Sequence, residues 1–255
     1  MDKTTEQPKD WLQLAEKAAK LAGDFLRKSR DNLITITSEA VHDVKIKADH
    51  EAEKIIIDVL QKTGFSILSE EAGLLPAKID SPLKWIVDPL DGTVNYLNGL
   101  PICCVSISLW EKEIPVLGVV FDFLHGDIYT GLVGVGAWLN AVAITVKPQR
   151  PVNQSILCTG FPVAMDFSSE SLQAFIGQIS SFKKVRLFGS AAMSLAFVAA
   201  GLADAYYERS IKIWDVAAGL ALVKAAGGVI EVRYQSSAGV VDAYAGTGFL
   251  IEGQH

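Results

Sequence analysis

An apolar run that ends in two aspartates is the segment with the most chemical content. In Trp85–Thr93, the apolar residues lead into Asp88 and Asp91, which Gly92 and Thr93 follow. Two carboxylates this close repel one another unless a cation neutralises them. Such hard oxygen ligands suit Mg²⁺, and the Thr93 hydroxyl could orient a water molecule. Asp-Pro-Leu-Asp-Gly is also ordinary turn chemistry, so by itself the segment leaves a turn and a metal site open.

Two other segments carry acids directly beside apolar elements. Glu70 and Glu71 follow the strand-like run Phe65–Leu68, and Asp215 follows Trp214. Each has a simpler explanation, because paired acids can be solvated and Asp215 could be an ordinary helix N-cap. Considered separately, these segments do not decide between structure and chemistry.

Together, and in this order, the segments resemble the inositol monophosphatase family of Mg-dependent, lithium-sensitive-type phosphatases. The resemblance covers nearly the whole chain and rests on the following segments: Asp43–Asp49, Glu70-Glu71, Trp85–Tyr96, Gly134–Asn140, Gly189–Ala192, Gly201–Glu208 and Trp214–Gly219. The Asp-Pro-Leu-Asp-Gly-Thr and Trp-Asp pieces are the most specific, and they favour the metal site over the turn.

The resemblance implies two or three Mg²⁺ ions and a set of oxygen ligands: Glu70, Asp88, the backbone carbonyl of Leu90, Asp91 and Asp215. Asp49 is expected to hold or orient a water molecule on a further ion. Five converging acids would repel a phosphate dianion, and the cations reverse the local charge. Glu70 with Thr93 would then orient and deprotonate an attacking water. No covalent nucleophile is needed.

The substrate contacts implied by the resemblance come from both ends of the chain: Asp91, Gly92, Thr93, Gly189, Ser190, Ala191, Glu208 and Asp215. The N–H groups of Gly92 and Thr93 would hold phosphate oxygens, especially if a helix begins there. Glu208 matches the position that accepts a hydrogen bond from the inositol ring, although it could also be an exposed acid after a strand. The expected reaction converts inositol monophosphate to myo-inositol and phosphate.

Three lysines keep a bisphosphate substrate open. Lys212 could attract a second phosphate, and Lys45 and Lys47 are expected on one face of a strand. Fructose 1,6-bisphosphate is the stronger alternative, because the short chain and Glu208 speak against 3′-phosphoadenosine 5′-phosphate. An additional regulatory role in transcription is the alternative from another class, since some bacterial members of the family bind transcription machinery.

The composition is that of a globular chain and limits the partners. Of 255 residues, 50% are hydrophobic, and the net charge is −6 without a long basic run. Direct nucleic-acid binding is therefore not expected. The polar N-terminus and the Gly- and Asn-interrupted apolar segments predict a soluble, cytoplasmic protein without membrane spans. We expect a homodimer that takes a small phosphorylated substrate. The three cysteines are expected as reduced core residues.

The periodicity predicts an N-terminal α+β half, residues 1–147, and a C-terminal α/β half, residues 148–255. A first helix is expected from a capping box at Asp10–Gln13, and a second from Asp49 to Lys62 before Gly64. A mostly antiparallel sheet and then alternating strands and helices should follow. The expected strands are Phe65–Leu68, Lys84–Val87, Ile102–Leu109, Val116–Phe121, Asp127–Leu132, Ile156–Thr159, Val185–Leu187, Ala205–Tyr207 and Val229–Val232. The later helices are Ser169–Ser180, Ser190–Ala200 and Asp215–Ala226. The family's layered αβαβα sandwich is the implied fold.

Overall fold

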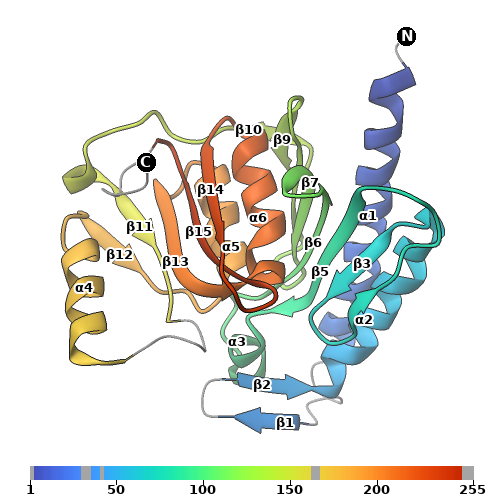
Figure 1. Ribbon diagram of the computed structural model, residues 1–255, viewed down its shortest axis with the longest axis horizontal. Coiled ribbons are helices and arrows are strands. Elements are labelled where there is room, and N and C mark those ends of the chain that lie inside the picture. Colours follow the sequence, from blue (N-terminus) through green and yellow to red (C-terminus); the bar gives the residue numbers. More distant parts are fainter. Residues whose placement is uncertain (1–2, 30–35, 41–42, 162–166, 249–255) are drawn as a thin grey trace.

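Helices and sheets alternate in five layers along the molecule (Figure 1). The computed structural model describes residues 3–29, 36–40, 43–161 and 167–248. The outer helices α1 (Lys3–Ser29) and α2 (Lys47–Leu60) cover the first sheet. Helices α5 (Ala191–Ala199) and α6 (Ile213–Ala225) lie between the two sheets, and α4 (Ser169–Ile179) flanks the second. The expected αβαβα sandwich is confirmed.

The first sheet has eight strands in the order β10-β9-β8-β7-β6-β5-β3-β4. All neighbours are antiparallel except the parallel pair β3–β5, so the expectation of a mostly antiparallel sheet is confirmed. The bounds are β3 Ser66–Ser69, β4 Gly73–Leu75, β5 Leu83–Asp91, β6 Cys104–Glu111, β7 Ile114–Asp122, β8 Asp127–Leu132, β9 Gly136–Leu139 and β10 Val142–Ile144. The sequence did not predict β4, β9 or β10, which are short and lack a buried alternating face.

The second sheet has five strands in the order β12-β11-β13-β15-β14. The first three run parallel, and β15 pairs antiparallel with both of its neighbours. The bounds are β11 Ile156–Cys158, β12 Lys184–Arg186, β13 Ala205–Lys212, β14 Val229–Tyr234 and β15 Val240–Gly246. Strand β15 was not predicted. Smaller elements are the hairpin β1 (Ile36–Ala40) and β2 (Asp43–Ile46), helix α3 (Thr93–Asn98), and the 3₁₀ turns Gln61–Thr63 and Val152–Gln154.

The first helix begins before its predicted cap. Helix α1 starts at Lys3 and runs through Pro8 and Asp10, so the capping box expected at Asp10 is wrong. Pro8 is the sixth residue of this helix, so it lies just beyond the first turn and removes one backbone N–H donor. The second helix ends as expected, because the following 3₁₀ turn is closed by Gly64 in the left-handed conformation, with φ 76°.

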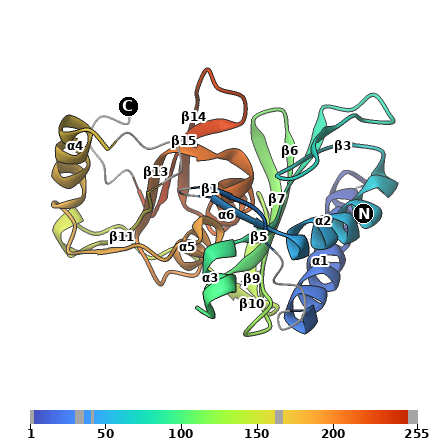
Figure 2. The ribbon, with the colours of Figure 1, turned by 90° about the horizontal axis from the view of Figure 1, so that it is seen from below.

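Two hydrophobic cores lie on opposite faces of the first sheet. Trp85 belongs to the core under α1 and α2, whereas Trp110 belongs to the core that surrounds α5 and α6. The view from below shows α5 and α6 between the two sheets (Figure 2). Because both sheets pack on the same helices, the division into two halves near residue 147 stays a prediction. The three cysteines are buried and reduced, as expected.

Helix α6 approaches its neighbours closely through two glycines. A Cβ atom on Gly118 of β7 would lie 2.3 Å from the carbonyl oxygen of Ala218, and one on Gly219 would lie 2.3 Å from the Cβ atom of Leu195. Side chains at either position would push α6 away from β7 or α5. With this close packing, the first turn of α6, which contains Asp215, lies near the end of strand β5, which contains Asp88.

Within the described parts of the chain, no helix combines the length and the hydropathy that a membrane span needs.

Substitution of Gly118 by alanine tests this packing. Overfilling a packed interior costs about 1–3 kcal/mol, so Gly118→Ala should lower the free energy of unfolding by that amount in urea. Gly177→Ala on α4 is the matched control, because nothing lies within 4 Å of its added Cβ atom. This control should be neutral or stabilising by up to about 1 kcal/mol, since alanine is the better helix former. Equal effects at the two positions would contradict the packing argument.

Candidate active site at the ends of β5 and α6

The two central aspartates lie where β5 ends and α3 begins. The Leu90 N–H donates to Asp88 Oδ1 at 2.9 Å, and the Thr93 hydroxyl donates to the Leu90 carbonyl at 3.0 Å. The segment is thus a hydrogen-bonded turn that also presents carboxylates. The Leu90 side chain is fully buried in the first core, so its size matters as well as its apolar character.

Gly92 is required by both conformation and space. Its φ is 89°, in the left-handed region, and an added Cβ atom would lie 2.8 Å from the Ile102 carbonyl oxygen. Helix α3 starts directly after it, at Thr93, and has no side-chain cap. The helix start on which the predicted phosphate contact depends is therefore present.

Asp91 connects β5 to the beginning of α5. Its carboxylate accepts hydrogen bonds from the Ser190 hydroxyl and from the backbone N–H groups of Ala191 at 3.3 Å and Ala192 at 2.8 Å. The structure thus places Gly189, Ser190 and Ala191 beside Asp91, but Ser190 and Ala191 already donate to it. Nothing in the sequence indicates that this acid also caps a helix.

Asn95 fixes the same loop from α3, and sequence reasoning missed this role. Its side-chain amide donates to the carbonyl oxygens of Ile102 at 2.8 Å and Phe188 at 2.7 Å. Asn95 is buried, so these bonds also satisfy its amide. The only signal in the sequence was a polar residue just after the Asp-Gly-Thr segment.

Asp215 lies in the first turn of α6, and the alternative that it is the N-cap is wrong. The N-cap is Lys212, because α6 begins at Ile213. The Lys212 backbone N–H donates to the Asp215 carboxylate, the reciprocal half of a capping box. Asp215 is half-buried.

Four of the predicted ligands act electrostatically on one another. Burial raises the pKa of Asp88 well above 3.8, and the charges of Glu70, Asp91 and Asp215 raise it further. The pKa of Asp215 is likewise raised by burial and then by Glu70 and Asp91. Burial also raises the pKa of Asp91, although the bonds from α5 oppose the shift. The structure therefore brings Glu70, Asp88, Asp91 and Asp215 together in a cluster that favours protons or cations.

The donor chemistry of this cluster fits Mg²⁺. No three acidic, histidine or cysteine side chains within the described ranges already surround one point as a finished metal shell. The carboxylates are nevertheless hard oxygen donors, and their mutual repulsion is what divalent cations relieve.

Asp49 has a structural role that the resemblance did not imply. Its Oδ2 accepts the backbone N–H of Ile46 at 2.9 Å, which caps helix α2. Its charge is not among the main contributions to the raised pKa values of Asp88, Asp91 and Asp215. The structure thus places Asp49 at a helix start, and its expected role toward a metal-bound water stays a prediction.

Glu208 is buried on β13, so the alternative of an exposed acid is wrong. The Tyr206 hydroxyl donates to Glu208 Oε2 at 2.8 Å, and an added Cβ atom on Gly160 would lie 2.8 Å from the same oxygen. Burial raises the pKa of Glu208 to about 7; the Tyr206 bond lowers it, and the Asp91 charge raises it. The carboxylate therefore lies within electrostatic reach of the acid cluster.

Lys45, Lys47 and Lys212, which were predicted as possible contacts for a second phosphate, are not arranged as expected. Strand β2 ends at Ile46 and Lys47 is the first residue of α2, so the expectation that Lys45 and Lys47 share a strand face is wrong. The Lys45 side chain lies outside the described structure. The Lys212 ammonium lies 5.5 Å from the centre of the Trp214 ring.

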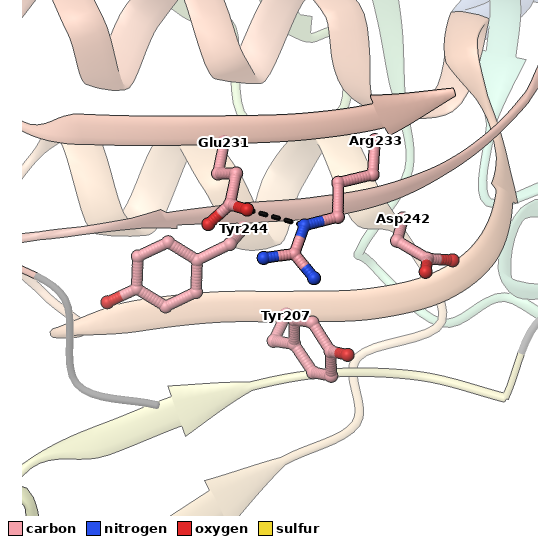
Figure 3. A pocket seen from close by; sticks show the side chains of 5 residues that line it. All are labelled: Tyr207, Glu231, Arg233, Asp242 and Tyr244. Carbon is pink, nitrogen blue, oxygen red and sulfur yellow. Dashed lines mark hydrogen bonds and ion pairs between the residues drawn. The ribbon is translucent and has the colours of Figure 1, made fainter. Parts of the chain in front are cut away.

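A separate small pocket lies on the outer face of the second sheet (Figure 3). Its cavity of about 10 Å³ is lined by Tyr207, Glu231, Arg233, Asp242 and Tyr244. Along a strand, successive side chains point to opposite faces, so Tyr207 faces away from Glu208. The pocket is therefore not part of the acid cluster, and it has room for about one water molecule.

The acid cluster predicts opposite effects of two similar substitutions on the metal-free protein. Raised carboxyl pKa values stabilise the fold fully below pH 3.8 and lose that contribution as pH rises through the raised values. Asp88→Asn removes one charge and keeps an oxygen for Leu90, so its stability at pH 8 should equal or exceed that of the unsubstituted protein. Asp91→Asn must turn an NH₂ group toward a backbone donor of α5, at a cost of about 1–3 kcal/mol.

Urea unfolding of both variants with chelator at pH 6 and pH 8 measures the difference. Asp91→Asn should be the less stable of the two. The reverse order would contradict the capping role of Asp91.

Comparison with known proteins places the chain in a family. The model of the inositol monophosphatase family matches residues 7–249. A protein named Nus factor SuhB from Xylella fastidiosa is 39% identical over 224 residues, covering 86% of this chain and 80% of that protein. An inositol-1-monophosphatase from Synechocystis is 34% identical over 225 residues, covering 87% and 78%. The structure of inositol monophosphatase from Anabaena superposes with a TM-score of 0.80 at 32% identity, covering 94% and 91%. The chain therefore belongs to the inositol monophosphatase family, whose members are metal-dependent phosphatases.

Proposed function

We propose that the chain hydrolyses inositol monophosphate to myo-inositol and phosphate in a Mg²⁺-dependent reaction. The observation that carries the proposal is the cluster of the buried Asp88 and Asp91 with the half-buried Glu70 and Asp215, whose charges need cations. The buried acceptor Glu208 lies within electrostatic reach of that cluster. Family membership supports the phosphatase reaction, and the position of Glu208 supports a polyol leaving group.

The metal-holding residues in this proposal are Glu70, Asp88, the carbonyl of Leu90, Asp91 and Asp215. Bound Mg²⁺ would supply the positive charge that offsets these carboxylates and the substrate phosphate, and would increase the acidity of water. Glu70 with Thr93 would orient the attacking water, and Glu70 would accept its proton. Because the Thr93 hydroxyl donates its proton to Leu90, its lone pairs can accept from that water.

The phosphate would be held at the start of α3. Gly92 and Thr93 present backbone N–H groups there, and Gly92 lets the chain turn sharply enough to do so. The loop Gly189–Ala191 would frame the ring, with its position set by the bonds to Asp91 and Asn95. The substrate would thus bridge elements that follow β5 and precede α5.

A second role is proposed on a specific similarity. Because the Xylella relative is named a Nus factor, a regulatory role in transcription is a candidate for this chain as well. It is compatible with catalysis, because the chain retains the predicted set of acidic ligands. Asp88→Asn separates the two, since it should abolish turnover and leave a protein-binding role intact.

Metal dependence should be complete. Chelator should abolish hydrolysis of inositol 1-phosphate, and added Mg²⁺ should restore it, because the acid cluster repels a phosphate dianion.

Asp88→Asn should lower kcat by at least about 10²-fold, the loss expected on removal of one electrostatic stabiliser. Steady-state assays across a Mg²⁺ series measure both effects, and full activity in excess chelator would exclude the mechanism.

Glu208 should decide recognition of the ring. A charge-assisted hydrogen bond is worth about 1.5–3 kcal/mol, so Glu208→Ala should lower kcat/KM for inositol 1-phosphate by about 10- to 150-fold. Hydrolysis of p-nitrophenyl phosphate, which has no ring hydroxyl to offer, should change little. Equal losses on both substrates would assign Glu208 to the metal site or the fold.

The same residue predicts a pH dependence. The pKa of Glu208 is raised to about 7. Only the deprotonated carboxylate can accept a hydrogen bond from a ring hydroxyl on either of its oxygens. The kcat/KM ratio of inositol 1-phosphate to p-nitrophenyl phosphate should therefore fall as pH decreases from 8 to 6. The ratio should be flat with pH in Glu208→Gln, which carries no titrating group.

A further inference from the structure

A buried glutamate on α2 faces the turn that carries Glu70. Glu53 is 5% exposed and lies on the inward face of the helix with the buried residues Ala52 and Ile56. It follows Asp49 by four residues, so the two acids share one helix face. A carboxylate this buried is retained only where donors satisfy it.

The donors come from the residues on both sides of Glu70. Glu53 Oε1 accepts the Ser69 hydroxyl, the Glu71 N–H at 3.0 Å and the Ala72 N–H at 3.0 Å. All three bonds end on one oxygen atom. The β3–β4 turn therefore wraps around this oxygen, and Glu70 lies at the centre of the wrapped segment.

The opposite side of the turn is held by the sheet. The Glu70 N–H donates to the Val87 carbonyl at 3.2 Å, which continues the β3–β5 pairing by one residue. Glu71 turns away toward α2, where its buried carboxylate lies 3.6 Å from the His50 ring. Of the two adjacent acids, Glu70 is the one whose charge acts on Asp88 and Asp215.

We propose that Glu53 is a positioning residue for Glu70. It holds the backbone on both sides of Glu70, so that the Glu70 carboxylate meets the metal ions and the attacking water in one orientation. Glu53 acts through the turn, because its three observed bonds all end on the residues that flank Glu70. The inference rests on the proposed function, in which Glu70 is both ligand and base.

Two substitutions at Glu53 and one matched control test the role. Glu53→Gln keeps an oxygen where all three bonds end and should retain activity within about tenfold. Glu53→Ala removes the acceptor and should lower kcat/KM by about 10²-fold, the loss expected for a small displacement of a catalytic group. Glu51→Ala, on the exposed face of the same helix, should leave activity unchanged. Ser69→Ala removes one of the three bonds and should give a loss between those of Glu53→Gln and Glu53→Ala. This variant tests the role of Glu53 if Glu53→Ala does not fold.

A double substitution separates positioning from general support of the fold. If Glu53 acts only through Glu70, then Glu53→Ala in a Glu70→Gln background should cost less than about twofold more activity, because the effects of coupled residues are not additive. Losses that multiply would overturn the proposal. So would unchanged activity in Glu53→Ala.

The Mg²⁺-induced rise in Tm gives a readout that does not depend on turnover. Outer-shell substitutions weaken metal binding by about 10- to 100-fold, so Glu53→Ala should need that much more Mg²⁺ for half of the rise. Glu53→Gln should lie close to the unsubstituted protein, and Glu51→Ala should match it. If the unsubstituted protein fails to hydrolyse any phosphate ester, the proposed function fails, but the Mg²⁺ titration still decides the role of Glu53. Identical Mg²⁺ dependence of Glu53→Ala and Glu51→Ala would overturn it.

Discussion

The repulsion among four carboxylates is the constraint on which the rest of the site depends. Left to relax, Glu70, Asp88, Asp91 and Asp215 would move apart or take up protons, because burial strengthens their mutual repulsion. Each is instead held at a different place: the Glu70 backbone N–H donates to the Val87 carbonyl of β5. Asp88 is bonded within its own turn, Asp91 to the start of α5, and Asp215 to the N-cap of α6.

The ties to helix starts also contribute electrostatically. The first turns of α5 and α6 carry partial positive charge from their free N–H groups. Asp91 and Asp215 lie at these turns, so part of the cluster's negative charge is offset by the backbone before any cation binds. The close packing of α6 at Gly118 and Gly219 therefore serves the site, because it sets where one of these helix starts lies.

The segment that connects the two sheets carries an ion pair between the half-exposed Arg150 and the buried Asp204. Arg150 donates two hydrogen bonds, of 2.7 and 2.6 Å, to the carboxylate of Asp204, which also accepts the Ile156 N–H at 2.8 Å. Burial alone would raise the pKa of Asp204, but the Arg150 bonds outweigh it and hold the pKa below its usual value. The pair ties the segment between β10 and β11 to the end of the turn before β13. These bonds thus anchor the connecting segment to the beginnings of β11 and β13.

Elements that are marked by their own residues could be predicted from the sequence. Features that depend on contacts with residues far away in the chain could not. Strand β8 has the predicted bounds, because apolar residues and flanking glycines mark it. The capping role of Asp91 could not be predicted, because it depends on where α5 begins a hundred residues later. For Asp215 the sequence suggested a cap but not its position, because α6 begins two residues before it. Glu53 gave no signal beyond an acid on an apolar helix face.

The hydrogen bonds that the sequence did not predict and the acids that it did predict have complementary roles. A motif such as Asp-Pro-Leu-Asp-Gly-Thr places charges in the chain, but charges alone would destabilise the metal-free fold as pH rises. Backbone donors of α2, α5 and α6 compensate by binding Asp49, Asp91 and Asp215 at helix starts. Since the same hydrogen bonds that stabilise these acids also fix their orientation, the site is preorganised by the interactions that make its charge tolerable.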